Sequence, residues 1–187
     1  MALRVFVSSV IEGFEVYREA ARKGIVATGG EPVLVNEDFP ARDVSPRNAC
    51  LEAVASCDVY LGILGGRAGF EAPSGRSVVE EEYEEAMRCQ LPVFVFIQKT
   101  DRERRQQEMV DRLSDFVDGR YRIEFDGPGE LEGKVRSALE GMLSTATIRA
   151  NLAMVDAQPN TCTIVCHGSD GLKDGVAAAS RPAGAGP

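Results

Sequence analysis

The sequence predicts an α/β domain in which a five-stranded parallel sheet is covered by helices on both faces. Strand-like and helix-like segments alternate five times along the chain, and a strict alternation of this kind gives parallel strands joined by right-handed crossovers. The run Val59–Leu64 is apolar almost throughout, as expected of a central strand buried on both faces. Pairs of residues that contain glycine or proline lie at the ends of predicted strands and helices, so the limits of these segments are clear.

The expected strands are short runs rich in β-branched and aromatic residues. They are Arg4–Val7, Pro32–Val35, Val59–Leu64, Val93–Ile97 and Tyr121–Phe125. The expected helices carry apolar residues at spacings of three and four. They are Phe14–Thr28, Pro46–Ser56, Ser77–Gln90, Glu103–Val117 and Glu130–Ala150.

One compact domain is expected over residues 1–150, followed by a poorly structured tail or linker over residues 151–187. The chain has 187 residues, of which 44% are apolar, so it can bury a core without a metal or a disulfide framework. The tail contains one strand-like run, Thr161–Cys166, and ends in a stretch rich in small residues, proline and glycine. Such a composition is typical of linkers.

Charge and cysteine content narrow the function classes. The chain carries 21 Lys and Arg against 29 Asp and Glu, a net charge of −8, which argues against general nucleic-acid binding. No apolar run approaches the ~18 residues of a membrane span, and no secretory signal is evident. The five scattered cysteines favour reduced thiols and a cytoplasmic protein; they are Cys50, Cys57, Cys89, Cys162 and Cys166.

No metal site and no resident cofactor are expected. Cys162 and Cys166 lie in a β-branched, alternating run, and in a strand they would stand about 13 Å apart, too far to share one ion. The chain has a single histidine, His167, which lies in the tail. Zinc chemistry and a serine or cysteine hydrolase therefore lack support.

Candidate ligand-binding residues follow three of the predicted strands. In an open parallel sheet the ligand crevice lies beyond the carboxyl ends of the strands. Serine hydroxyls there can bond a ribose or a phosphate, or they can cap the next helix. A glycine-rich loop lets a ligand approach backbone N–H groups, or it forms an ordinary turn. The candidates are Ser8 and Ser9, then Asp38 and Phe39 beside a base, then Gly65, Gly66, Arg67 and Gly69.

Glu82 is the candidate catalytic residue. It lies in the helical segment SVVEEEYEEAMRCQ, which contains five glutamates. On a helical wheel Val79, Tyr83 and Ala86 mark the inward face. Glu82 falls about 60° from that face, whereas the other four glutamates fall about 100° or more away. The wheel therefore predicts that Glu82 alone turns inward, either for a task or as a boundary residue paired with an arginine such as Arg67 or Arg76.

Three segments together resemble a known family. They are RVFVSSVIEGFEVYREAA, EPVLVNEDFPARDVSPRNACLEAVASCDVYLGILGGRAG, and SGRSVVEEEYEEA followed by LPVFVFI. They resemble the uncharacterised domain family numbered four-zero-six-two among domains of unknown function. That family is related to TIR domains and similar to nucleoside deoxyribosyltransferases, and it often stands at the N-terminus of STAND-type signalling ATPases. The resemblance implies a three-layer, flavodoxin-like and TIR-like fold.

The resemblance also implies a chemistry. In enzymatic TIR domains and deoxyribosyltransferases, a glutamate on the helix after the third strand acts at the ribose carbon of an N-glycosidic bond. Spacing to the alanine four residues later places that glutamate at Glu82, with Ala86 as the alanine. The Trp-Cys pair that precedes the glutamate in many TIR domains is replaced here by Val78-Val79.

These observations lead to one functional hypothesis and two alternatives. The hypothesis is a TIR-like signalling or defence module that binds a nucleotide or dinucleotide and acts through Glu82 as an NAD nucleosidase, with NAD as substrate rather than cofactor. The first alternative is a non-catalytic module that self-associates or contacts STAND-type partner domains. The second is an enzyme resembling nucleoside deoxyribosyltransferases.

Overall fold

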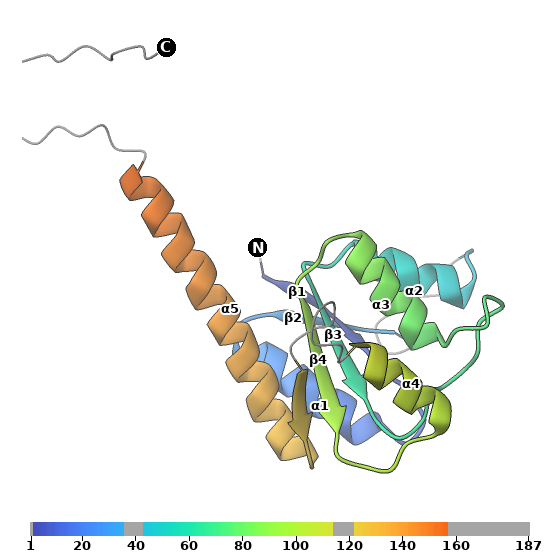
Figure 1. Ribbon diagram of the computed structural model, residues 1–187. Helices are drawn as coiled ribbons and strands as arrows, with labels where there is room; N and C mark the ends of the chain where they lie inside the picture. Colours follow the sequence, from blue (N-terminus) through green and yellow to red (C-terminus); the bar gives the residue numbers. More distant parts are fainter. Residues whose placement is uncertain (1, 36–42, 114–121, 157–187) are drawn as a thin grey trace, which may run out of the picture.

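A computed structural model describes residues 2–35, 43–113 and 122–156 (Figure 1). Strands and helices alternate strictly, which confirms the predicted α/β class. In chain order they are β1 (Arg4–Ser8), α1 (Glu15–Ala27), β2 (Glu31–Leu34), α2 (Pro46–Ala55), β3 (Val59–Leu64), α3 (Val78–Arg88), β4 (Val93–Gln98), α4 (Arg104–Leu113), β5 (Arg122–Phe125) and α5 (Pro128–Asp156).

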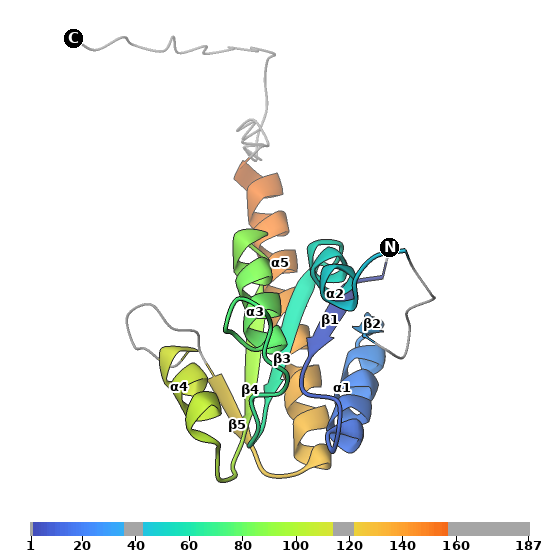
Figure 2. The same cartoon turned by 90° about the vertical axis from the view of Figure 1, so that its right-hand side faces the viewer.

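The five strands form one parallel sheet in the order β2-β1-β3-β4-β5. Helices α1 and α5 cover one face, and α2, α3 and α4 cover the other (Figure 2). The chain moves outward from β1 to β2 and then returns past β1 to β3, so the strand order reverses between β1 and β3. Ligands of open α/β sheets bind at such a switch point, beyond the carboxyl ends of the strands.

The core lies on both faces of the sheet, as strand alternation requires. In β1, Val5 and Val7 pack toward α1 and α5, whereas Phe6 packs toward α2 and α3. All six residues of β3 are buried, which confirms the prediction of a central strand covered on both sides. Strands β1 and β3 therefore lie in the buried centre of the domain.

Helix α5 packs along α1 and then continues beyond the sheet (Figure 1). Gly24 allows the two helices to approach closely, because a Cβ there would lie 2.7 Å from the backbone carbonyl of Glu132. The helix runs through residue 150 to Asp156, so it crosses the predicted limit between domain and tail. The division into a domain and a tail stays a prediction. The predicted strand Thr161–Cys166 lies outside the described residues, as do Cys162, Cys166 and His167.

The described residues contain no helix that is both long and apolar enough for a membrane crossing. Over the same ranges, no group of three or more His, Cys, Asp or Glu residues could hold a metal ion. Cys50, Cys57 and Cys89 are free thiols.

Candidate functional site

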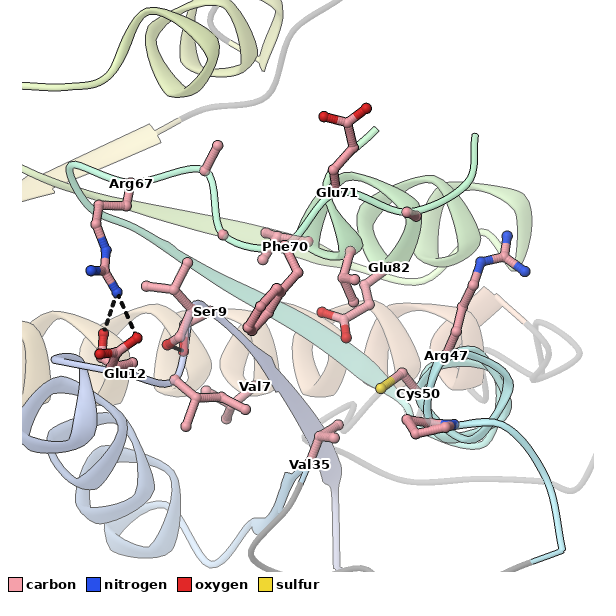
Figure 3. Close-up of a pocket in the computed structure, with 18 of the residues that line it drawn as sticks. Val7, Ser9, Glu12, Val35, Arg47, Cys50, Arg67, Phe70, Glu71 and Glu82 are labelled. Atoms are coloured by element: carbon pink, nitrogen blue, oxygen red, sulfur yellow. Dashed lines mark hydrogen bonds and ion pairs between the residues drawn. The ribbon is translucent and has the colours of Figure 1, made fainter. Parts of the chain in front are cut away.

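A cleft of about 1020 Å³ opens at the carboxyl ends of β1 and β3 (Figure 3). Its walls come from the β1–α1 loop, the β3–α3 loop, and the first turns of α2 and α3. The walls combine aliphatic side chains with a small set of charged groups. The lining residues include Ser9, Glu12, Arg18, Val35, Arg47, Cys50, Arg67, Gly69, Phe70 and Glu82. The cleft therefore lies beyond the carboxyl ends of the strands, as predicted, and at the switch point between β1 and β3.

Glu82 supplies a buried carboxylate in the wall of the cleft. The residue lies in the second turn of α3 and is only 5% exposed. The helix begins with a capping box, in which the Ser77 hydroxyl accepts from the Glu80 N–H and the Glu80 carboxylate accepts from the Ser77 N–H. This cap fixes the helix start and with it the direction in which Glu82 projects.

The carboxylate of Glu82 is held by two neighbouring side chains. The hydroxyl of Ser8, at the end of β1, donates a 2.5 Å hydrogen bond to Oε2. The thiol of Cys50, on α2, also hydrogen-bonds the carboxylate. Tyr60, fully buried on β3, lies behind this pair and hydrogen-bonds Ser8. Residues from three elements therefore position one carboxylate.

Burial raises the pKa of Glu82 to about 7, because desolvation disfavours the charged form. The hydrogen bonds from Ser8 and Cys50 and the positive charge of Arg18 act in the opposite direction, and Glu81 adds a small repulsion. A carboxyl group with a pKa near neutrality is poised to exchange a proton or to stabilise a nearby cation. The same desolvation, followed by the charge of Glu82, raises the pKa of the Cys50 thiol to about 12, which makes that thiol a poor nucleophile.

Arg18 is a site residue that the sequence analysis missed. It lies on α1, is 2% exposed, and lines the cleft. Its guanidinium donates to Ser9 Oγ at 3.1 Å and to the carbonyl of Val35 at 2.9 Å. The signal was present in the sequence, because Arg18 lies four residues after Phe14 and seven before Ile25, on the buried stripe of its helix. An arginine on the apolar face of a helix indicates a buried charge, and a buried charge needs hydrogen-bond or ion-pair partners.

The prediction that Glu82 alone turns inward was wrong. Glu80 and Glu81 are also buried, at 9% and 7% exposure. Glu80 pairs with Arg112, and Glu81 accepts two hydrogen bonds from Arg47, at 2.5 and 3.0 Å. A helical wheel gives angles relative to the apolar face of one helix, but α3 lies between α2 and α4 (Figure 2). Its flanks are therefore covered as well.

The five glutamates nevertheless differ in their partners. The side chains of Glu84 and Glu85 lie nearer solvent and pair with Arg76 and Arg88. Among the five, Glu82 is the one that the cleft lining includes, and no arginine within residues 2–35, 43–113 and 122–156 forms a salt bridge with it. The arginines suggested as its partners are engaged elsewhere, Arg67 with Glu12 and Arg76 with Glu84.

The structure brings some of the predicted ligand residues to the cleft. Ser9, Arg67 and Gly69 line it, and Gly69 has a φ of +76° that favours glycine. Ser8 is 1% exposed and contacts Glu82 rather than the open cleft. Asp38 and Phe39 lie outside the described residues.

Gly65 and Gly66 are placed for packing and do not line the cleft. A Cβ on Gly65 would lie 2.1 Å from the ring of Phe14, and one on Gly66 would lie 2.7 Å from the carbonyl of Asp101. A larger residue at either position would therefore clash with these neighbours. Their absence from the cleft lining corrects the expectation that they let a ligand approach.

Residues 4–140 match the family described as "Domain of unknown function (DUF4062)". Comparison with curated proteins gives no match. Among solved structures, the RPS4 and RRS1 TIR domain heterodimer is similar with a TM-score of 0.50 and 17% identity, over 75% of this chain and 97% of that one. This agrees with a TIR-like, flavodoxin-like fold.

Two further structures are similar at lower scores. The CMP N-glycosidase BcmB of Clostridium botulinum has a TM-score of 0.46 and 15% identity, over 71% of this chain and 97% of that one. The 2-desoxiribosyltransferase from Leishmania mexicana has a TM-score of 0.41 and 17% identity, over 63% of this chain and 75% of that one. At these identities the likeness concerns the fold alone.

Proposed function

The chain belongs to the DUF4062 family, and we propose that its cleft binds a nucleotide or dinucleotide and that Glu82 cleaves the N-glycosidic bond of that ligand. The observation that carries the proposal is the Glu82 carboxylate itself, buried at the switch point of the sheet and reachable from the cleft. Burial of an ionisable group costs folding stability unless the group is paired. A buried carboxylate in the wall of a cleft is therefore a candidate functional group. NAD is the first candidate substrate.

The proposed reaction needs one carboxylate near the ribose. The C1′–N bond breaks with both electrons leaving on the base nitrogen, and positive charge develops on C1′ and the ring oxygen. The ionised Glu82 stabilises that charge in a water-poor wall, where electrostatic interactions are strong. A water then adds to C1′ and gives its proton to Glu82. A base that is neutral in the substrate leaves as an anion and takes up this proton. The nicotinamide ring, which is cationic in NAD, leaves as a neutral base, and the proton then passes to solvent.

Ser8, Cys50 and Arg18 are positioning residues in this reaction. The first two donate hydrogen bonds to the carboxylate, and the charge of Arg18 lowers its pKa. All three therefore favour the ionised form against the desolvation that opposes it. The balance leaves Glu82 available in both protonation states near neutral pH.

Arg67 is the cation best placed for a phosphate of the ligand. It lines the cleft and pairs with Glu12 at 3.5 Å, with side-chain exposures of 54% and 88%. An exposed ion pair of this length is weak and exchanges readily. Arg47 donates two hydrogen bonds to the carboxylate of Glu81, so it is less free to change partners.

Product analysis with a substrate panel tests the proposal. Purified protein is incubated separately with NAD, with ribonucleosides, with 2′-deoxyribonucleosides and with nucleoside monophosphates, and the free base is quantified by chromatography. The proposal expects release of the base from at least one compound. Transfer of the sugar to an added second base, in place of its release to water, would favour the deoxyribosyltransferase-like alternative. No base released from any compound at high protein concentration would contradict both enzymatic functions.

A non-catalytic interaction module is the second candidate. The observation that favours it is the presence of two exposed apolar side chains in the cleft wall, Phe70 at 85% and Ile11 at 41% exposure. Exposed apolar groups that gather in one region mark protein contacts as well as ligand sites. Sedimentation over a range of concentrations tests this function, since a self-associating module forms oligomers without any ligand. Contacts with STAND-type domains stay a prediction from the resemblance.

A further inference from the structure

Phe70 is an exposed aromatic side chain in the wall of the cleft. It is 85% exposed and lines the same cleft as Glu82, and Figure 3 shows its side chain extending into the pocket. Val7 and Val35 lie on the opposite side in the same view. The ring thus borders a space that has one aromatic and one aliphatic side.

The loop that carries Phe70 is braced at several points. The Phe70 carbonyl accepts from the Val78 N–H at 3.1 Å, and Glu71 and Ser77 form an antiparallel bridge. Arg105, on α4, donates to the carboxylate of Glu71 and to the carbonyl of Gly75, each at 2.6 Å. The backbone under the ring is therefore fixed before a ligand arrives, which lowers the entropic cost of binding.

We infer that Phe70 is the platform on which the base of the ligand stacks, and that it determines how the ribose meets Glu82. This inference rests on the proposed function. Every nucleobase presents a flat aromatic face, and stacking on a protein aromatic ring is worth on the order of 1–3 kcal/mol. With the base on Phe70, the glycosidic carbon lies toward the carboxylate. Phe70 is then a specificity residue, which acts on binding and orientation and takes no part in the bond cleavage.

A tryptophan variant gives a readout that is independent of catalysis. The chain contains no tryptophan, so Phe70→Trp introduces a single indole at the proposed platform. Adenosine, inosine and cytidine are titrated separately while the tryptophan emission is recorded. Stacking predicts saturable quenching by these nucleosides and none by ribose 5-phosphate, which lacks a base. Val26→Trp is the matched control, because Val26 is 57% exposed and is not part of the cleft lining.

Truncation of the ring tests its energetic role. Phe70→Ala is expected to weaken nucleoside binding about tenfold or more, measured by calorimetry, while the affinity for ribose 5-phosphate stays within about twofold. In a substrate that the wild type cleaves, KM is expected to rise by a similar factor, with a smaller change in kcat.

The outcomes separate this inference from the function on which it rests. One outcome is that nucleosides quench Phe70→Trp and bind Phe70→Ala more weakly, although the wild type cleaves no compound. This outcome would uphold the platform and overturn the proposed reaction. Cleavage that depends on Glu82, together with no quenching and unchanged KM in Phe70→Ala, would overturn the platform alone. Absence of nucleoside binding in the wild type would overturn it too. So would dissociation of a wild-type oligomer by Phe70→Ala with nucleoside affinity unchanged, because the ring would then belong to an interface between copies.

Discussion

The hydroxyl of Ser8 donates a 2.5 Å hydrogen bond to the carboxylate of Glu82, although the two residues are 74 positions apart in the sequence. Ser8 ends β1 and Glu82 lies on the helix after β3, so the contact spans the point where the strand order reverses. A short bond from a hydroxyl to a carboxylate is a charge-assisted interaction. It ties the candidate catalytic group to the center of the sheet.

Ser8→Ala is expected to raise the pKa of Glu82 above about 7, because the lost hydrogen bond favoured the ionised form. A shift of about one unit or more is expected from the loss of a bond to a charged group. Carbon-13 NMR titration of the side-chain carboxyl measures it without requiring activity. The exposed Ser144→Ala on α5 serves as control and should leave the titration unchanged. An unchanged pKa in Ser8→Ala would show that the bond does not stabilise the charge.

Arg18→Met is expected to raise the pKa of Glu82 as well, since the nearby positive charge lowers it. The substitution also leaves the Val35 carbonyl without its 2.9 Å donor, which costs roughly 1–3 kcal/mol of folding free energy. Urea denaturation and the NMR titration measure the two effects separately. Lys23→Met, on the exposed side of the same helix, should change neither. A stable Arg18→Met variant with the wild-type pKa would remove Arg18 from the site.

Glu82→Gln is expected to stabilise the fold at pH 8 and to have little effect near pH 5. The folded-state pKa, about 7, lies above the ordinary value of 4.5, so the folded state binds the proton more tightly than the unfolded state. Stability of the wild type therefore falls as pH rises from about 4.5 to about 7, and the loss persists above that range. Glutamine carries no charge, so the variant avoids a cost of about 3 kcal/mol.

Denaturation curves at the two pH values check this expectation, with the exposed Glu84→Gln as control. Equal stability of wild type and Glu82→Gln at pH 8 would mean that the buried charge is fully compensated by its neighbours.

Gly65→Ala is expected to destabilise the domain by about 1–3 kcal/mol, because the new Cβ would lie 2.1 Å from the ring of Phe14. Gly127→Ala, where a Cβ meets nothing within 4 Å, is the control. Thermal melts compare the two. A neutral Gly65→Ala variant would reopen the ligand-binding interpretation of this glycine.

The sequence was sufficient for the fold because periodicity and turn residues are local signals. Alternating segments identified all ten elements, most of them with bounds within two residues of those observed, although α5 runs six residues beyond its predicted end. Strand β3 was identified as central from composition alone. The site was only partly predictable. Glu82 could be selected by its wheel angle and by the resemblance, but its neighbours could not, since Cys50 reaches it from α2 through tertiary packing.

The wrong prediction for Glu80 and Glu81 has the same cause. The burial of Glu80 and Glu81 depends on Arg112 and Arg47, which approach from helices on either flank. A helical wheel contains no information about those flanking helices. Gly65 and Gly66 resembled a ligand loop for a similar reason, because the sequence does not reveal that Phe14 and Asp101 occupy the adjacent space.

The most direct test of the proposed role of Glu82 is the single-turnover rate of base release by Glu82→Gln, measured on the substrate that the wild type cleaves best. The variant keeps the size of the side chain and removes the charge that would stabilise the ribosyl cation. We expect the rate to fall about a hundredfold or more, whereas Glu84→Gln, which alters an exposed glutamate of the same helix, should stay within about twofold of the wild type. A Glu82→Gln variant that releases base at the wild-type rate would contradict the assignment of Glu82 as the catalytic residue.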